Sequence, residues 1–409
     1  MKFKCINEAL DWIMAQRRNG SEFNKFKKVI EELDNPQDKF KMIHVAGTNG
    51  KGSTITYIRD ILMMNGYKVG TMQSPHYLTH LDRIRINNQN IPDEVFLRIL
   101  NQNVDYYIQK ELNMFEMDYL IMCQYFLEED VDFAIVEVGM GGRLDSTNVV
   151  NRPILSIITT IGYDHMKELG DTLEKICIEK CGIIKNNCPV LIGDLEDNLK
   201  LIVKNIAEER NSEYLVLDDY TYIKPTLFKY HNERYEISSY AKYQVHNASL
   251  ALKAIDYLKD YHYIKYDIGQ IKKALKISLW KGRFEIVNDE PMVIVDGAHN
   301  IEAIKALVDS LKDIKLTKGI LFSAINTKEY AKMLNLLMEY GDELVITSFD
   351  HPLIIDGKKL ANEFNIQYIK DNTKAYNYLK DRYQCIIVCG SLYFLSEMIS
   401  KGEICKKIK

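Results

Sequence analysis

The chain has 409 residues, of which 46% are hydrophobic and 27% charged, with 8 Pro and 21 Gly. This composition excludes a disordered or collagen-like polymer and predicts a globular protein of about two domains. The 53 Lys and Arg residues nearly balance the 57 Asp and Glu residues, and the net charge of −4 provides no basic field for binding a nucleic-acid backbone.

The hydropathy of the chain and the spacing of its cysteines are both typical of a cytoplasmic protein. No apolar run approaches the roughly 18 residues of a membrane span, and the N-terminal residues lack the apolar core of a signal peptide. The eight cysteines include no C-x-x-C pair, which favours reduced thiols in the core over a metal site. We therefore expect a cytoplasmic protein with no membrane or nucleic-acid partner.

Short apolar runs that end in Gly or polar residues recur along the first two thirds of the chain. They predict buried parallel strands at residues 43–47, 133–139, 154–161 and 189–193. Helical patterns lie between them, such as Ser53 to Asn65, which Gly66 is expected to end. This alternation predicts an α/β fold with a doubly wound, mostly parallel sheet.

The pattern changes after residue 193, and the later part of the chain suggests a second, smaller α/β domain. Residues 194–240 are rich in Tyr, Lys and Glu and are expected to form peripheral strands and a sheet edge. We place the domain boundary near residue 288, just before a new apolar run. The expected elements around and beyond it are helices at 245–258, 266–275 and 301–311 and strands at 291–295, 319–322, 343–346 and 385–390.

The first predicted strand runs into a glycine-rich loop, Gly47-Thr48-Asn49-Gly50-Lys51-Gly52-Ser53-Thr54. In such a loop backbone N–H groups surround phosphate oxygens, and the following helix adds the positive end of its dipole. We expect Lys51 to reach the β- and γ-phosphates, and Ser53 or Thr54 to contact phosphate or Mg²⁺. The spacing G-x-x-x-x-G-K-[ST] is not met literally, because Gly52 intervenes. A plain helix cap is the alternative, but strand, lysine and amphipathic helix together favour a nucleotide site.

A nucleotide site also needs a carboxylate to hold its metal ion. Glu137 is the sole acid in the apolar run 133–138, and we predict it to be the first metal ligand. A solvent-facing glutamate is the alternative, which the apolar neighbours of Glu137 disfavour because an unpaired buried carboxylate is costly. The loop Gly139 to Gly142 follows at the carboxyl end of this strand, where α/β sheets bind ligands.

Taken in chain order, these and further motifs resemble the folylpolyglutamate synthase/dihydrofolate synthase family, a branch of the Mur ligase superfamily. The resemblance spans nearly the whole chain. It is carried by Asn35-Pro36-Gln37, the loop Gly47 to Ser53, Ser74-Pro75-His76, Arg83-Ile84-Arg85-Ile86-Asn87, Glu137 to Asp145, Asp164-His165, Gly170 to Leu173, Glu179-Lys180, His246-Asn247-Ala248, Gly282 to Glu285, Asp296-Gly297-Ala298-His299-Asn300 and Gly390 to Phe394.

The resemblance implies an ATP-dependent amide ligase with ATP and Mg²⁺ as cofactors. It would add L-glutamate to the γ-carboxylate of folates or to dihydropteroate. In this family the substrate carboxylate attacks the γ-phosphate, and the amino group of glutamate then attacks the acyl phosphate. The implied architecture is an ATP- and folate-binding domain at residues 1–288 and a glutamate-binding α/β domain at 289–409, working as a monomer.

The family's catalytic and metal-binding residues correspond to a few positions. Ser74 and Glu137 are implied as ligands of one Mg²⁺ and His165 as a ligand of a second. Lys180 matches the family's carbamylated lysine, whose two carbamate oxygens suit a hard cation better than an ammonium group does. A solvated helix lysine and a capped turn histidine are the alternatives at positions 180 and 165. Lys51, Lys180 and His165 are the expected catalytic residues.

The resemblance also implies the binding residues. Asn247 matches an adenine contact, Arg283 lies at the hinge between the domains, and Asp296 completes the nucleotide pocket; a helix-cap Asn, a surface Arg and a strand-end Asp are the structural alternatives. The expected ATP-binding set is Asn49, Gly50, Lys51, Gly52, Ser53, Asn247, Arg283 and Asp296. The expected substrate-binding set is Ser74, Pro75, His76, Leu144, Asp145, Ser146, His299 and Ser391, with the last two on the glutamate side.

Two other functions remain open at this point. One is another Mur-type amino-acid ligase acting on a cell-wall precursor, which Ser74-Pro75-His76 and the lack of an added N-terminal UDP-binding domain disfavour. The other is a nucleotide switch that makes no bond. The motif Asp296 to Asn300 disfavours a switch, because a switch needs no nucleotide contacts from a second domain.

Overall fold

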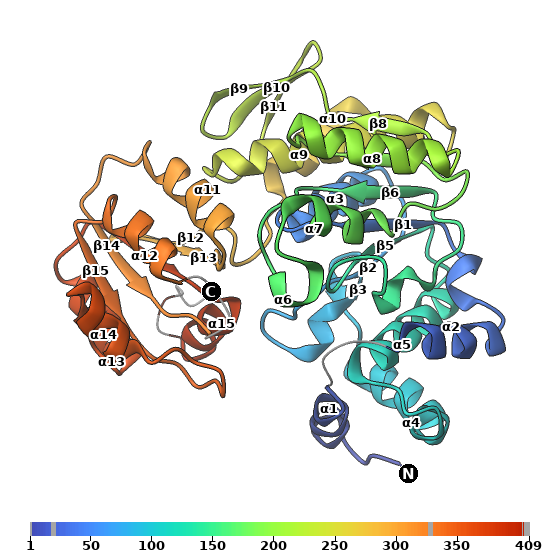
Figure 1. The fold of residues 1–409 in the computed structure, drawn as a ribbon, viewed down its shortest axis with the longest axis horizontal. Helices are drawn as coiled ribbons and strands as arrows, with labels where there is room; N and C mark the ends of the chain where they lie inside the picture. Colours follow the sequence, from blue (N-terminus) through green and yellow to red (C-terminus); the bar gives the residue numbers. More distant parts are fainter. Residues whose placement is uncertain (1, 18–21, 326–329, 403, 405–409) are drawn as a thin grey trace. The chain divides into compact units, whose positions relative to one another are not determined.

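The computed structural model describes residues 2–17, 22–325, 330–402 and 404 (Figure 1). The chain divides into two compact units. Unit 1 comprises Met1–Tyr220 and His246–Ser278, and unit 2 comprises Thr221–Val245 and Leu279–Lys409. The functional limits expected on either side of residue 288 stay a prediction.

Unit 1 is built on an eight-stranded sheet with the strand order β4-β3-β2-β5-β1-β6-β7-β8. The strands are β1 (Met42–Ala46), β2 (Val69–Met72), β3 (Ile84–Ile86), β4 (Gln89–Asn90), β5 (Phe133–Glu137), β6 (Leu155–Ile158), β7 (Val190–Ile192) and β8 (Tyr214–Val216). Strands β2, β5, β1, β6, β7 and β8 are parallel, whereas β3 and β4 add an antiparallel edge. The predicted mostly parallel sheet is confirmed.

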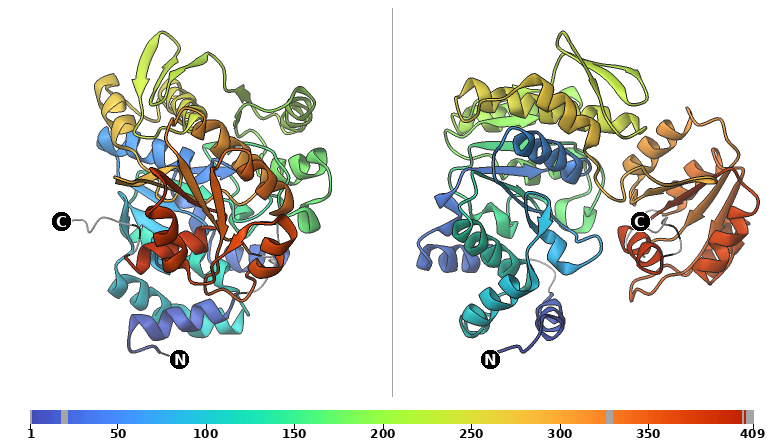
Figure 2. Two further views of the ribbon diagram at one scale, coloured as in Figure 1. Left: turned by 90° about the vertical axis from the view of Figure 1, so that its left-hand side faces the viewer. Right: turned by 180° about the vertical axis from the view of Figure 1, so that it is seen from behind.

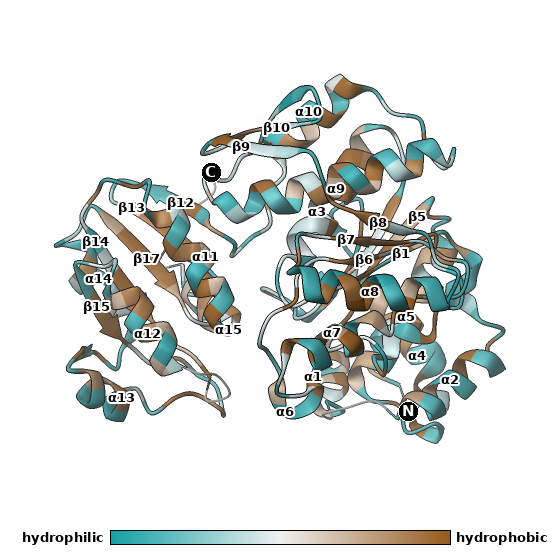
Figure 3. Cartoon of the chain, turned by 45° about the horizontal axis from the view of Figure 1, so that its top comes forward, coloured by the Kyte–Doolittle hydropathy of each residue, from teal (hydrophilic) through white to brown (hydrophobic). Residues whose placement is uncertain are grey.

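Helices connect these strands and cover the sheet (Figure 2). They are α1 (Ile6–Ala15), α2 (Phe23–Glu32), α3 (Lys51–Met64), α4 (Asp93–Gln109), α5 (Met114–Glu128), α6 (Met166–Leu169), α7 (Leu173–Cys181), α8 (Asp197–Glu209), α9 (Lys242–Asp260) and α10 (Ile268–Ile277), with short 3-10 turns at Pro36–Lys39, His80–Arg83 and Ser146–Val149. Helix α3 packs against β1, β2 and β5, and α10 packs on α3. The central strands are therefore covered by protein, which fits their almost uniformly apolar sequences (Figure 3).

Unit 2 has a six-stranded sheet with the order β12-β13-β17-β14-β15-β16 and a separate three-stranded sheet, β11-β10-β9. In the larger sheet only β12 pairs antiparallel to its neighbour. The elements of unit 2 are β9 (Tyr220–Lys224), β10 (Leu227–Tyr230), β11 (Glu233–Glu236), β12 (Glu285–Asp289), β13 (Met292–Asp296), α11 (Ile301–Leu311), β14 (Lys318–Phe322), α12 (Tyr330–Met338), β15 (Glu343–Ile346), α13 (Gly357–Phe364), β16 (Gln367–Tyr368), α14 (Asn372–Lys380), β17 (Cys385–Cys389) and α15 (Leu392–Ser400).

One expectation about the fold is wrong. The segment 194–240 contains the edge strand β8 and the strands β9 to β11, as expected, but it also contains the helix α8. Its buried residues Leu199, Val203 and Ala207 recur every four positions, which is the spacing of one helix face. Leu201, Ile202 and Ile206 lie between them, and the rest of segment 194–240 is rich in Tyr, Lys and Glu, so this period does not stand out.

Two expectations about composition can be compared with the structure. Within the described ranges, none of the helices is long and apolar enough to cross a membrane. Seven cysteines are described, and all have free thiols; six of them are buried, whereas Cys5 is exposed. Cys405 lies outside the described residues.

Candidate functional site

The glycine-rich loop between β1 and α3 has a backbone that requires glycine. Gly47 and Gly50 have φ angles of +149° and +84°, and Gly50 immediately precedes the helix that begins at Lys51. Thr160 fixes the loop from the end of β6: its carbonyl accepts from Thr48 N at 2.8 Å and its Oγ1 accepts from Asn49 N at 2.9 Å. The loop is thus preformed at the N-terminus of α3, with Gly52 in the first turn and Ser53 buried. This geometry fits phosphate binding.

Asn247 reaches this loop from helix α9. A Cβ atom at Gly50 would lie 2.5 Å from Asn247 Oδ1, so the amide packs directly against the turn. Asn247 is buried. The structure therefore brings together two expected ATP-binding positions that are almost 200 residues apart.

Lys51 and Lys180 both extend toward the same loop. Lys51 Nζ donates to the carbonyl oxygens of Gly47 and Thr48 at 3.1 and 3.4 Å. Lys180, near the end of α7, donates from Nζ to Gly47 O at 3.0 Å and is 4% exposed. Burial, and then the charge of Lys51, lowers the pKa of Lys180 to about 7. Lys180 is therefore not the solvated helix lysine of the alternative interpretation.

Glu137 ends strand β5 beside this loop. Its side chain is 6% exposed, and Oε1 lies 3.7 Å from Lys51 Nζ. Oε2 accepts from the backbone N–H of Ser74 at 3.4 Å. The carboxylate is therefore held between a lysine and a backbone amide at the carboxyl edge of the sheet, which contradicts the solvent-facing alternative.

His165 lies in a more exposed position. Its side chain is 46% exposed, and it precedes helix α6 with a left-handed backbone, φ +51°. The backbone N–H of His165 donates to Asp164 Oδ1 at 2.9 Å. The ring nitrogen Nε2 of His165 lies 3.9 Å from the same carboxylate oxygen. The structure shows a turn histidine beside a carboxylate, and the predicted metal role of His165 stays a prediction.

These side chains can be tested against a magnesium role. In the described part of the chain, no three His, Cys, Asp or Glu side chains converge as a metal cage. Mg²⁺ commonly uses one or two carboxylates together with phosphate oxygens and water, so Glu137 beside the phosphate loop fits such an ion. The Ser74 backbone N–H donates to Glu137 and so orients the carboxylate.

The loop after β5 is organised by Asp145. Asp145 Oδ2 accepts from Met140 N at 2.9 Å, and Oδ1 accepts from the N–H and hydroxyl of Thr147 at 3.0 and 2.6 Å. Burial raises the pKa of Asp145, and these donors oppose that rise. Ser146 is also buried, whereas Leu144 is half exposed. Asp145 thus connects the two ends of the 139–146 loop, which contains the predicted substrate-binding residues Leu144, Asp145 and Ser146.

The predicted substrate segment Ser74-Pro75-His76 leads into a turn built by Asp82. The Asp82 carboxylate accepts backbone N–H groups of residues 77, 78 and 79 at 2.7 to 3.2 Å. His76 is partly buried, and burial, followed by the charge of Arg83, lowers its pKa to about 4. His76 is therefore neutral near pH 7.

The four expected residues of unit 2 lie around the end of β13 and the start of α15. Asp296 is buried and accepts from Tyr243 OH at 2.6 Å, Phe284 N at 2.9 Å and Ala298 N at 2.8 Å. A Cβ atom at Gly297 would lie 2.7 Å from Arg283 Nη1, which places that guanidinium beside the same turn. His299 Nδ1 lies 2.7 Å from Gly297 O, and Ser391 precedes α15.

Sequence reasoning missed several side chains that shape unit 1. A Cβ at Gly139 would lie 3.1 Å from the ring of Phe115, so the start of α5 packs on the loop that Asp145 organises. Thr159 donates to Asn49 O at 2.6 Å and lies against Gly47. The pair Thr159-Thr160 directly after an apolar run could have indicated a polar strand end. Phe115 carries no such signal.

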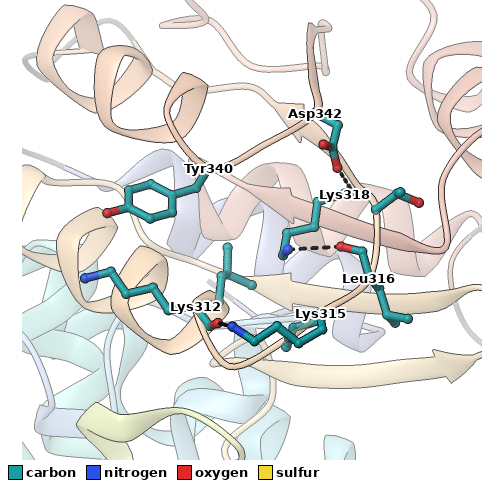
Figure 4. A pocket seen from close by; sticks show the side chains of 9 residues that line it. Lys312, Lys315, Leu316, Lys318, Tyr340 and Asp342 are labelled. Carbon is teal, nitrogen blue, oxygen red and sulfur yellow. Dashed lines mark hydrogen bonds between the residues drawn. The ribbon is translucent and has the colours of Figure 1, made fainter.

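Unit 2 also contains a cavity of about 530 Å³ (Figure 4). Its polar lining residues are Lys312, Lys315, Thr317, Lys318, Tyr340 and Asp342, and Leu311, Ile314 and Leu316 complete it. Its lysines are bonded to protein groups: Lys312 Nζ donates to Asp309 of α11 at 3.1 Å, Lys315 Nζ donates to Lys312 O at 2.9 Å, and Lys318 Nζ donates to Leu316 O at 3.0 Å. None of the predicted site residues lines this cavity, so it is separate from the candidate site.

Comparison with known proteins gives a consistent result. Residues 45–255 match the Mur ligase middle domain, and residues 282–392 match the Mur ligase glutamate ligase domain. The dihydrofolate synthase/folylpolyglutamate synthase of Bacillus subtilis is 32% identical, over 97% of this chain and 99% of its own length. The probable dihydrofolate synthetase of Schizosaccharomyces pombe is 31% identical, over 91% of this chain and 95% of its own length.

Solved structures agree with the sequence relatives. A bifunctional folylpolyglutamate synthase/dihydrofolate synthase with Mn, AMPPNP and L-glutamate bound superposes with a TM-score of 0.86 at 26% identity, covering 97% of this chain and 98% of that one. The folylpolyglutamate synthase of Thermotoga maritima gives a TM-score of 0.81 at 28% identity, covering 98% and 97% of the two chains.

Proposed function

The chain belongs to the Mur ligases, in the family of folylpolyglutamate and dihydrofolate synthases, and on this premise we propose that it joins L-glutamate to a pterin-bearing carboxylic acid. The reaction consumes ATP and releases ADP and phosphate. The acid is a folate, glutamylated at its γ-carboxylate, or dihydropteroate. The observation that carries the proposal is the convergence of Lys51, Lys180 and Glu137 on the phosphate loop.

The first step brings together two anions, the substrate carboxylate and the γ-phosphoryl group. The carboxylate oxygen attacks phosphorus, the bond to the β-phosphate oxygen breaks, and ADP leaves. Lys51 and the N-terminus of α3 offset the negative charge that develops on the transferred group. The loop holds the triphosphate rigidly because Thr159 and Thr160 fix its backbone, which favours an in-line approach.

Glu137 would hold a Mg²⁺ ion at the same edge, with Ser74 beside it. Bound there, the ion would supply positive charge that screens the phosphate oxygens. Lys180 would contribute to the same site as a carbamate. With a pKa of about 7, its amine is substantially neutral at physiological pH and able to combine with CO₂, which forms a carbamate and releases a proton. The carbamate would provide oxygen ligands in place of a repelling ammonium group.

In the second step the amino group of glutamate attacks the acyl phosphate, and phosphate leaves from a tetrahedral intermediate. Unit 2 offers the side chains proposed for this partner, His299 and Ser391, while Arg283 and Asp296 are proposed for the nucleotide. Asp296 receives three hydrogen bonds and so maintains its turn. We place the enzyme in the cytoplasm, where its cosubstrate ATP is available.

The decisive experiment is a substrate panel. The purified chain is incubated with ATP, Mg²⁺ and labelled glutamate together with dihydropteroate, tetrahydrofolate, a methylene- or formyl-folate, or no acceptor. We expect label in a pterin product, and ADP release only when acceptor and glutamate are both present. Equal ATP hydrolysis without either substrate would contradict the proposal and favour a nucleotide switch, whereas incorporation into a cell-wall precursor alone would indicate another Mur-type ligase.

A further inference from the structure

A chain of three buried side chains links the central strand of unit 1 to the loop after β5. His44, in the middle of β1, places Nε2 2.8 Å from Thr147 Oγ1, and Thr147 Oγ1 lies 2.6 Å from Asp145 Oδ1. His44 and Thr147 are fully buried and Asp145 is 8% exposed. Burying a histidine inside a parallel sheet costs free energy relative to burying an apolar residue. The presence of His44 at this position therefore calls for a structural reason.

The direction of the chain follows from the donors available. An ionised carboxylate only accepts, so the single hydroxyl hydrogen of Thr147 points to Asp145. Thr147 Oγ1 must then accept from His44, which places the imidazole proton on Nε2. Burial, followed by the charge of Lys185, lowers the pKa of His44 to about 3, so the ring stays neutral. Nδ1, buried without a partner, is then the unprotonated nitrogen, and no buried N–H of this ring lacks an acceptor.

Asp145 connects the hydrogen bonds of His44 and Thr147 to the 139–146 loop. Its other oxygen accepts from Met140 N, and a Cβ at Gly139 would lie 3.2 Å from that oxygen. The carboxylate is therefore packed against the start of the loop while bonded to Thr147 beyond its end. If the Thr147 hydroxyl were absent, the buried Asp145 carboxylate would lose its shortest hydrogen bond and would be oriented less firmly. The same strand that carries the phosphate loop at its end thus also fixes the second loop through His44.

We propose that His44 and Thr147 are positioning residues that act through Asp145 to hold the 139–146 loop in the conformation that binds the pterin-bearing substrate. The assignment of this loop to the pterin-bearing substrate rests on the proposed function. His44 is a fixed N–H donor in this arrangement and takes no part in proton transfer. Neither residue touches a reacting atom.

Paired variants of the full-length chain test this. Thr147→Val keeps the shape of the side chain and removes the hydroxyl, whereas Thr147→Ser keeps the hydroxyl. His44→Leu removes the donor, whereas His44→Gln places an amide N–H at a similar distance from the backbone. We expect Thr147→Val and His44→Leu to raise KM for the folate acceptor about tenfold or more. KM for ATP should change less than twofold, and the Ser and Gln variants should stay near wild type.

Equal rises in KM for both substrates, or an unchanged KM for the acceptor in Thr147→Val, would overturn the assignment in favour of a general packing role. Hydrogen exchange of residues 139–146 gives a second readout that needs no substrate. Exchange in this segment is expected to accelerate in Thr147→Val and not in Thr147→Ser, and identical exchange in the two variants would refute the positioning role. A wild-type chain that glutamylates no pterin acceptor would instead contradict the proposed function, whatever the exchange shows.

Discussion

The amino groups of Lys51 and Lys180 donate to one acceptor, the carbonyl oxygen of Gly47, at 3.1 and 3.0 Å. Two ammonium groups that share an oxygen repel each other, and one of them is also desolvated. Lys180, the more buried of the two, accordingly has its pKa lowered to about 7, by burial first and by Lys51 second. The arrangement places Lys51 where it can face phosphate and leaves Lys180 as an amine that is available for reaction.

This relationship predicts a shift in the pKa of Lys180 when Lys51 loses its charge. In Lys51→Met, the pKa of Lys180 is expected to rise toward its ordinary value, because the repelling neighbour is gone while the burial remains. Competitive amine labelling against pH, in CO₂-free buffer with mass-spectrometric readout, measures this. Lys185 is the internal control: burial, Arg210 and Lys27 lower its pKa to about 8, so its labelling profile should not move. A Lys180 profile equal to wild type would contradict the coupling.

Glu137→Gln tests the metal assignment. The amide keeps the size of the side chain but removes the charge that a divalent cation needs, so we expect the Mg²⁺ concentration for half-maximal rate to rise roughly tenfold or more. Initial rates over a Mg²⁺ titration at saturating ATP measure it. Glu128→Gln is the matched control, because Glu128 lies at the surface of α5, where it pairs with Arg98 and accepts a hydrogen bond from Gln124. If the Mg²⁺ dependence of both variants equals that of wild type, Glu137 is not a metal ligand.

The fold was predictable where burial makes the sequence uniform. Strands β1, β5 and β17 lie inside parallel sheets, so they appear as short, mostly apolar runs, interrupted in β1 by His44 and ended in β5 by Glu137. Helix α8 was missed because it buries only a narrow face at Leu199, Val203 and Ala207. The rest of segment 194–240 is rich in Tyr, Lys and Glu, so a single amphipathic helix within it does not stand out in composition.

The site was predictable where chemistry lies next to a strand end. Lys51 follows the central parallel strand β1 and Glu137 ends β5, and the carboxyl ends of such strands share one edge. Asn247 was reached through the family resemblance alone, since no spacing rule connects α9 to the phosphate loop. His44 could not be singled out, because one polar residue within an apolar run does not reveal which distant hydroxyl it bonds.

Two glycines with nearly equal positive φ angles allow the effect of side-chain packing at the phosphate loop to be separated from the effect of backbone strain. Gly50 and Gly66 have φ angles of +84° and +88°, but a Cβ at Gly50 would meet Asn247, whereas a Cβ at Gly66 meets nothing within 4 Å. Alanine at either position is expected to cost about 1–2 kcal/mol of unfolding free energy. Only Gly50→Ala should also weaken ATP binding, about tenfold or more, by calorimetry. Equal ATP affinity in the two variants would exclude tight packing of the loop on Asn247.

Tyr243→Phe tests the network around Asp296 in unit 2. Burial raises the pKa of Asp296, and the hydroxyl of Tyr243 opposes this by donating to the carboxylate at 2.6 Å. Because the folded-state pKa lies above the unfolded value, ionising Asp296 costs stability as pH rises through that window. Without the hydroxyl the cost is larger. The variant is therefore expected to lose about 1.5–3 kcal/mol of unfolding free energy at pH 7, and less at pH 4.5, where more of the carboxyl is protonated.

Trp280, half-buried in unit 2, reports this unfolding by fluorescence in a Trp12→Phe background, because the chain has two tryptophans and the other lies in unit 1. Tyr222→Phe is the control: its hydroxyl donates to Asp313 at 3.3 Å at the surface, where such a pair contributes little. A Tyr243→Phe loss that equals the control, or that grows as pH falls, would show that the hydroxyl does not stabilise the Asp296 carboxylate. A loss confined to neutral pH would instead establish that this carboxylate is ionised in the folded protein, as its proposed role in the nucleotide pocket requires.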